Sequence, residues 1–101
     1  MDQEKLESRM RFAEQVLEHH GAVPQDINQK NRDLLGQRVT YLLNGVYYRI
    51  GREDYDGETF IVLSAADDEK FASIGLMEDI QAFRADVSDE TVRKKIREAL
   101  S

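Results

Sequence analysis

Apolar residues near the start of the chain recur with the spacing of one helical face. Leu6, Met10, Ala13 and Leu17 are separated by four, three and four residues. This period is typical of an amphipathic helix with one buried side. Gly21 follows directly and is a suitable residue to end it. The pattern predicts an N-terminal helix over about residues 2–20.

A second helical pattern lies at the other end of the chain. Ser88 is a favourable N-cap, acidic residues occupy the first turn, and basic residues come late in the segment. The apolar residues of this segment again fall on one face: Val92, Ile96, Ala99 and Leu100. These features predict a C-terminal helix over about residues 89–100.

The middle of the chain has the pattern of a β-hairpin over residues 38–50. Two apolar runs flank Asn44-Gly45, the pair best suited to the two positive φ angles of a type I′ turn. Counting outward from this turn fixes which residues face each other across the hairpin. One face is then expected to receive six core residues: Val39, Tyr41, Leu43, Val46, Tyr48 and Ile50. The other face receives Thr40, Leu42, Tyr47 and Arg49, a mixed surface that helices need not cover.

The continuous apolar run "FIVL" predicts a strand over residues 59–64. Lack of alternation is typical of a strand that is buried on both faces, so this one needs a neighbour on each side. The hairpin provides one neighbour through an Asp56-Gly57 turn. Residues 79–85 are a possible strand on the other side.

Two further segments have weaker helical patterns. Ser64 and Asp67 resemble a capping box, and Phe71, Ile74 and Met77 share one helical face, which suggests a possible helix over residues 65–77. Residues 22–37 suggest a short helix, with Pro24 in its first turn and Gly36 at its end.

Together these elements predict an α+β fold, a small antiparallel β-meander packed by the two terminal helices. A chain of 101 residues is the size of one domain, so residues 1–101 are expected to form a single domain. The absence of cysteine excludes disulfides and thiolate chemistry. With an acidic start and no long apolar segment, a cytoplasmic location is expected.

Negative charge is concentrated in one window of the chain. The net charge is −6, yet residues 53–79 contain nine acids and one base, so the rest of the chain is slightly positive. If a helix over 65–77 returned antiparallel to the preceding strand, it would bring two groups of acids to one pole. The candidate partner-binding residues are Glu53, Asp54, Tyr55, Asp56, Glu58, Glu78 and Asp79.

Neither a metal nor a cofactor is predicted. An EF-hand alignment of the turn at Asp56-Gly57 places Arg52 and Leu63 at two essential ligand positions, so it fails. His19 and His20 are adjacent in a helix and point about 100° apart, which does not suit a shared metal ion. No phosphate-binding loop or nucleophile motif is present.

The composition therefore favours a non-catalytic acidic domain that docks on a basic protein surface, with Tyr55 as an aromatic anchor. One alternative is an enzyme or ligand-binding domain with a pocket that uses Glu78, Asp79 or His20. Another is an inhibitor whose carboxylates mimic nucleic-acid phosphates, and the acids could also be only a solvated surface. Direct nucleic-acid or membrane binding is not expected, whereas a homodimer through Leu42 and Tyr47 is possible.

Overall fold

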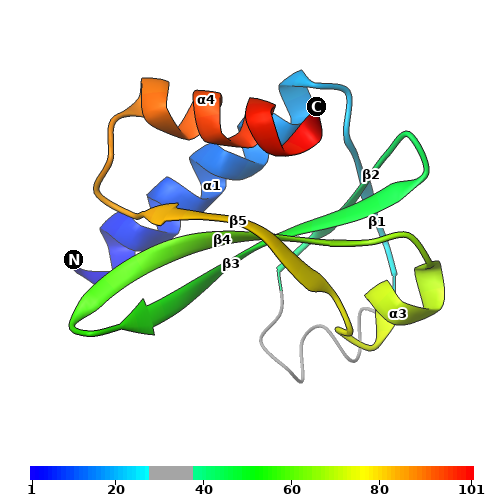
Figure 1. The fold of residues 1–101 in the computed structure, drawn as a ribbon, viewed down its shortest axis with the longest axis horizontal. Helices are drawn as coiled ribbons and strands as arrows, with labels where there is room; N and C mark the ends of the chain where they lie inside the picture. The colour runs from blue at the N-terminus through cyan, green and yellow to red at the C-terminus, as the bar shows by residue number, and fades with distance from the viewer. Residues whose placement is uncertain (28–37) are drawn as a thin grey trace.

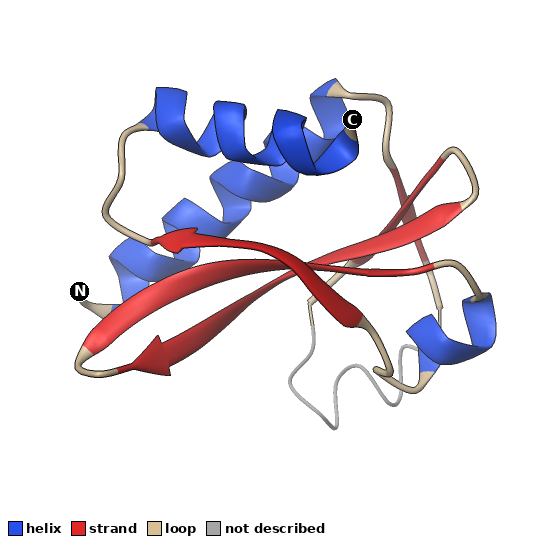
Figure 2. Cartoon of the chain, in the orientation of Figure 1, coloured by secondary structure: helices blue, strands red, loops and turns tan. Residues whose placement is uncertain are grey.

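The computed structural model describes residues 1–27 and 38–101 of the chain. This part forms a five-stranded antiparallel sheet whose strands lie side by side in chain order, and α1 and α4 pack on one face of it (Figures 1 and 2). The predicted α+β meander is confirmed. The elements are α1 (Gln3–His19), β1 (Val23–Gln25), β2 (Thr40–Leu43), β3 (Val46–Tyr55), β4 (Glu58–Ala66), α3 (Glu69–Ser73), β5 (Glu78–Arg84) and α4 (Asp89–Leu100).

Both terminal helices lie where the sequence predicts them. The Asp2 side chain caps α1 by accepting a hydrogen bond from the amide of Lys5 at 2.8 Å, and Gly21 follows the helix with a φ of 98°. Ser88 caps α4 by accepting one from the amide of Thr91 at 3.2 Å. The predicted apolar faces of α1 and α4 are buried against the sheet.

The β2–β3 hairpin has the predicted turn and register. Asn44 and Gly45 have φ angles of 51° and 80°, and the strands pair Leu43 with Val46 and Tyr41 with Tyr48. The six residues predicted to share one face are buried in the helix-covered core or packed against it. The hairpin prediction is therefore confirmed, although β3 continues to Tyr55.

A second two-residue turn joins β3 to β4. Asp56 and Gly57 have φ angles of 52° and 78°, the same left-handed pair as in the first turn. Beyond it, Ile61 and Leu63 of β4 are buried beneath the helices, while Val62 is buried on the opposite face. β4 lies between β3 and β5, so the predicted two-sided burial and the possible strand at 79–85 are both confirmed.

The predicted helix over residues 65–77 is largely wrong. β4 continues through Ala66, and α3 spans only Glu69–Ser73. Its N-cap is Asp68, whose side chain accepts from the amide of Lys70 at 2.7 Å, so Ser64 has no capping role. Gly75, with a φ of 78°, lies just after the helix, because a left-handed residue does not extend it.

The predicted short helix over residues 22–37 is wrong where it can be compared. Val23–Gln25 is a strand, β1, and its Pro24 lies opposite Tyr41 of β2. Proline is tolerated there because β1 is an edge strand that needs fewer backbone donors. Residues 28–37, which include Gly36, lie outside the described residues.

The face of the sheet opposite α1 and α4 is partly covered. Arg49 donates from Nη2 to the carbonyl of Ala72 in α3 at 2.9 Å and to Oγ1 of Thr40 at 2.8 Å. Thr40 is buried, and through Arg49 a helix contacts part of the mixed face that the sequence did not require helices to cover. Leu42 and Tyr47 pair across the hairpin on the same face and are half-buried.

One arginine joins α1 to the beginning of α4. Arg9 donates to the carbonyls of Ala85 at 3.3 Å and Val87 at 2.6 Å, and it pairs with Asp89 in the first turn of α4. Its guanidinium lies 5.5 Å from the centre of the Phe12 ring. These contacts fix the loop between β5 and α4, so the two helices lie side by side (Figure 1). No helix within the described ranges is long and apolar enough to cross a membrane.

The turn glycines give a direct test of this architecture. We expect Gly57→Ala to lower the free energy of unfolding by about 1–2 kcal/mol, because alanine is strained at a positive φ. Gly51→Ala is the matched control, since Gly51 lies in β3 with open space around its Cα and no positive φ. It should leave stability unchanged or slightly raised. Urea unfolding of both variants measures the difference, and equal loss in the two would contradict the assigned turn.

Candidate functional site

The acids predicted at residues 53–58 lie on the exposed tip of the β3–β4 hairpin. Glu53, Asp54, Asp56 and Glu58 are all exposed, and Tyr55 is 70% exposed. Asp56 belongs to the type I′ turn, where Asp and Asn tolerate a positive φ. The hairpin therefore presents an aromatic side chain among carboxylates, as the sequence suggests.

Two arginines reduce the negative charge of this tip. Arg52 Nη2 lies 2.7 Å from Asp54 Oδ2, and this contact, with the hydrogen bond from Thr59, lowers the pKa of Asp54. Arg84 Nη2 lies 3.2 Å from Glu58 Oε1, and Arg84 Nε lies 3.6 Å from Asp86. The hairpin tip is consequently a mixed surface and not an array of unpaired acids.

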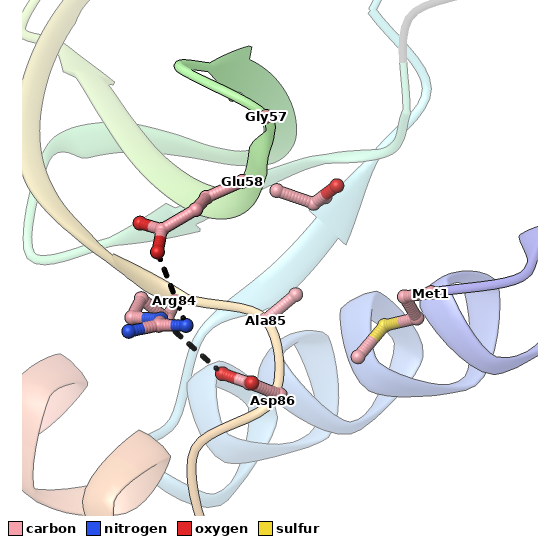
Figure 3. A pocket seen from close by; sticks show the side chains of 7 residues that line it. Met1, Gly57, Glu58, Arg84, Ala85 and Asp86 are labelled. Atoms are coloured by element: carbon pink, nitrogen blue, oxygen red, sulfur yellow. Dashed lines mark ion pairs between the residues drawn. The ribbon is translucent and has the colours of Figure 1, made fainter.

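A small cavity of about 160 Å³ lies beside the turn of the same hairpin. Figure 3 shows Arg84 between Glu58 and Asp86, with Met1 on the far wall. The guanidinium is held by these two carboxylates. The three charged side chains that line this cavity, Glu58, Arg84 and Asp86, are therefore paired with one another.

The structure does not bring Glu78 and Asp79 to the hairpin tip. Asp79 lies opposite Ser64 in the sheet, whereas Asp54 lies opposite Thr59. Five residues of β4 separate these two positions, about 17 Å at 3.3–3.4 Å per residue. The predicted single acidic pole is wrong, because α3 has only five residues and does not return along β4. β5 instead begins at the far end of β4 and runs back toward the turn.

The far end of β4 has a different character, because apolar side chains are exposed there. Phe71, Ile74, Leu76 and Ile80 are 50%, 54%, 62% and 39% exposed. They come from α3, from the loop after it and from β5. We call these four residues, with the flanking acids Asp67 and Glu78, the α3–β5 patch.

The α3–β5 patch includes a groove of about 340 Å³. Phe71, Leu76 and Ile80 line it, and Asp67 and Glu78 lie at the same groove. Ala65, Ala66 and Val46 of the neighbouring strands complete the lining. A groove with apolar walls and carboxylates beside them can accept an apolar side chain that has a positive charge close to it.

Sequence reasoning missed this patch because it placed Phe71, Ile74 and Met77 on the buried face of a longer helix. Two signals in the sequence indicate the shorter helix that the structure has. Gly75 follows Ile74, where a helix-ending glycine is common, and Asp68 is a better N-cap than Ser64 for a segment that begins at Glu69. With only five residues, α3 buries Ala72 and leaves Phe71 half exposed.

The buried ionisable groups link α1 to the strands. Glu14 is 2% exposed, and its carboxylate accepts from Arg38 Nη2 at 2.8 Å and Nε at 3.2 Å. Tyr41 donates its hydroxyl proton to Glu18 Oε1 at 2.9 Å. Burial, together with this hydrogen bond, raises the pKa of Tyr41 to about 12. The Tyr41–Glu18 contact joins α1 to β2, and the Glu14–Arg38 contact joins α1 to the segment just before β2, so both have a structural role.

The histidines do not join an acid cluster. His19 and His20 are exposed at the end of α1, where His20 is the C-cap. Within residues 1–27 and 38–101, no three His, Asp or Glu side chains are arranged to hold a metal ion. Ser64 donates from Oγ to Asp79 Oδ1 at 2.8 Å and is therefore paired with a carboxylate and not with an imidazole.

The chain matches no protein-family model, and no curated protein or solved structure matches it. The physical character of its surfaces is therefore the basis for assigning a function.

The Tyr41–Glu18 contact predicts a pH dependence of stability. Because the folded-state pKa of about 12 exceeds the ordinary value near 10, the folded protein keeps this proton between pH 10 and 12 while the unfolded chain loses it. The stability that the protonated Tyr41 contributes to the folded protein is fully present below pH 10 and is lost as the pH rises through 12. We expect it to amount to roughly 1–2 kcal/mol after allowance for solvent screening.

Urea unfolding at a series of pH values, compared between the wild type and Tyr41→Phe, measures this effect. The variant should lose less stability between pH 10 and 12 than the wild type. Parallel loss in the two proteins would show that Tyr41 titrates normally.

Proposed function

We propose that this protein is a non-catalytic binding domain that docks on a basic surface of a partner protein through the α3–β5 patch. The main observation is the exposure of four large apolar side chains within ten residues, Phe71 to Ile80, beside a concentration of acids. An exposed apolar cluster with a charged rim is the usual composition of a protein-binding surface.

Burial of these side chains supplies a driving force for association. Each large apolar side chain that becomes fully buried contributes about 1.5–3 kcal/mol. Association costs several kcal/mol in lost translational and rotational freedom, so one such side chain is not sufficient. Four neighbouring side chains provide the central apolar contact that interfaces need.

The charges around the patch favour a basic partner. The segment from Asp67 to Asp79 contains five acids and one base, Lys70. Asp68 caps α3 and Asp79 accepts a hydrogen bond from Ser64. Among the described residues, the remaining three acids take part in no ion pair: Asp67, Glu69 and Glu78. Lysine or arginine on a partner would raise the association rate and fix its orientation.

The β3–β4 hairpin tip is a second candidate surface, and the exposure of Tyr55 favours it. Its charge is weaker support, because Arg52 and Arg84 pair with two of its acids. The same pairing and the separation of the two acidic groups make phosphate mimicry a less favoured function.

A catalytic pocket is also less favoured. Glu78 lines the groove of the α3–β5 patch, but neither His20 nor Asp79 does. The most buried carboxylate among the described residues, Glu14, is paired with Arg38. Self-association through Leu42 and Tyr47 stays a prediction, which the mass of the protein in solution would test.

Capture of a partner from source-cell lysate by a panel of variants tests the proposed function. Ile74→Ser with Leu76→Ser removes apolar area from the patch, and Asp67→Lys with Glu78→Lys reverses its charge. We expect either pair to weaken capture at least ten-fold, since loss of about 1.4 kcal/mol of interface energy has this effect. All four side chains are exposed, so the variants should stay folded, which circular dichroism verifies.

The matched control is the hairpin pair Glu53→Lys with Asp56→Lys, which changes the net charge by the same amount at the other end of β4. This control variant should capture nearly as much of the partner as the wild type does. Loss of capture with the hairpin pair and retention with both patch pairs would refute the patch as the docking surface.

A further inference from the structure

The free edge of β5 adjoins the α3–β5 patch, so the mode of docking depends on whether that edge can accept a partner strand. β5 is the last strand of the sheet. An exposed edge strand is a common site for the addition of a peptide in extended conformation.

Part of this edge is already occupied by the protein's own groups. The amide of Ala82 donates to the side-chain Oε1 of Gln81 at 3.1 Å, and the carbonyl of Arg84 accepts from the amide of Val87 at 3.3 Å. The Gln81 side chain also donates from Nε2 to the carbonyl of Lys95 in α4 at 3.4 Å. A partner strand would have to displace these contacts.

The irregular pairing of β4 with β5 further disfavours strand addition. The register shifts between Leu63 and Ser64, so that Gln81 pairs with Leu63 and Asp79 pairs with Ser64. Ile80 is the extra residue of this bulge. Bulges twist a strand and interrupt the even row of backbone groups that an added strand would need.

The loop within the patch offers no free row of amides either. The amides of residues 74 to 77 all donate to carbonyls nearby in the chain: Ile74 to Lys70, Gly75 to Ala72, Leu76 to Phe71 and Met77 to Gly75, at 2.9–3.3 Å. The patch therefore presents apolar side chains and carboxylates to a partner, and few backbone donors.

A segment that docks on such a surface must satisfy its own backbone hydrogen bonds, because buried and unpaired amides are costly. An α-helix meets this requirement, and its apolar face can enter a groove while lysines and arginines lie along its sides. Resting on the proposed function, we infer that the partner docks through a basic amphipathic helix whose apolar side chains enter the groove beside Phe71, Leu76 and Ile80. Asp67 and Glu78 face its basic residues.

Three synthetic peptides of identical composition, rich in leucine and lysine, test this inference with the full chain. Each contains one proline. In the first peptide the leucines have helical spacing and the proline is at the end, and in the second the leucines alternate with lysine. The third has the helical order of the first, except that two residues are exchanged so that the proline lies at the centre. Chemical-shift changes of ¹⁵N-labelled protein map each binding site and give each Kd.

We expect the helical peptide to shift residues 67–80 and to bind at least ten-fold more tightly than the other two. Leu76→Ser should weaken it at least ten-fold. Tighter binding of the alternating peptide, with shifts at Ala82 and Arg84, would overturn the inference in favour of strand addition. Failure of the helical peptide to bind at about 1 mM, or shifts centred on residues 53–58, would also overturn it.

Three further outcomes separate this inference from the proposed function. If the NMR signals of the patch residues shift when the unliganded protein is diluted, a second copy of the chain occupies the patch, and the inference of a docked helix is overturned. If capture of the natural partner depends on Leu76 but the alternating peptide binds more tightly than the helical one, the inferred helical partner segment is wrong, and the α3–β5 patch is still the docking surface. If neither capture nor any peptide depends on Leu76, both fail.

Discussion

The structure depends on the register that two Asx-Gly turns impose on β2, β3 and β4. Asn44-Gly45 and Asp56-Gly57 both adopt paired positive φ angles, and each leaves a two-residue connection. Because side chains alternate along a strand, a slip by one residue at either turn would send the core residues of the strand that slips to the wrong face. With the register fixed, Tyr48, Ile50, Ile61 and Leu63 all lie beneath α1 and α4.

The same register decides where the charges lie. β3 and β4 pair over their whole length from the Asp56-Gly57 turn, so the acids that flank this turn stay at one end of the hairpin. β5 returns antiparallel to β4 and begins at the other end, which keeps Glu78 and Asp79 beside α3. The acidic excess of the sequence is thus divided between a hairpin tip with compensating arginines and a patch where the acids adjoin exposed apolar side chains.

Most of the fold could be predicted from local signals. Helical spacing with a terminating Gly21 and a cap at Ser88, and the turn at Asn44-Gly45, each act over a few residues and are readable directly. Asp68 and Gly75 are local signals of a short α3, but the exposure of the patch could not be predicted in this way, because Phe71 and Ile74 have the spacing of a buried helical face. Their exposure depends on how far β4 extends and on how little of the sheet α3 reaches, which are tertiary properties. Arg84 is likewise remote in sequence from Glu58, and only the pairing of β4 with β5 places it beside the hairpin acids, whereas the Arg52–Asp54 pair is a local contact within β3.

Hydrogen–deuterium exchange of the full chain, alone and with its captured partner, tests the account most directly. Exchange reports the protection of backbone amides along the whole chain in one experiment. Docking through the α3–β5 patch predicts added protection over residues 67–80 and unchanged exchange at residues 53–58. Protection confined to residues 53–58 would place the partner on the hairpin tip and contradict the account.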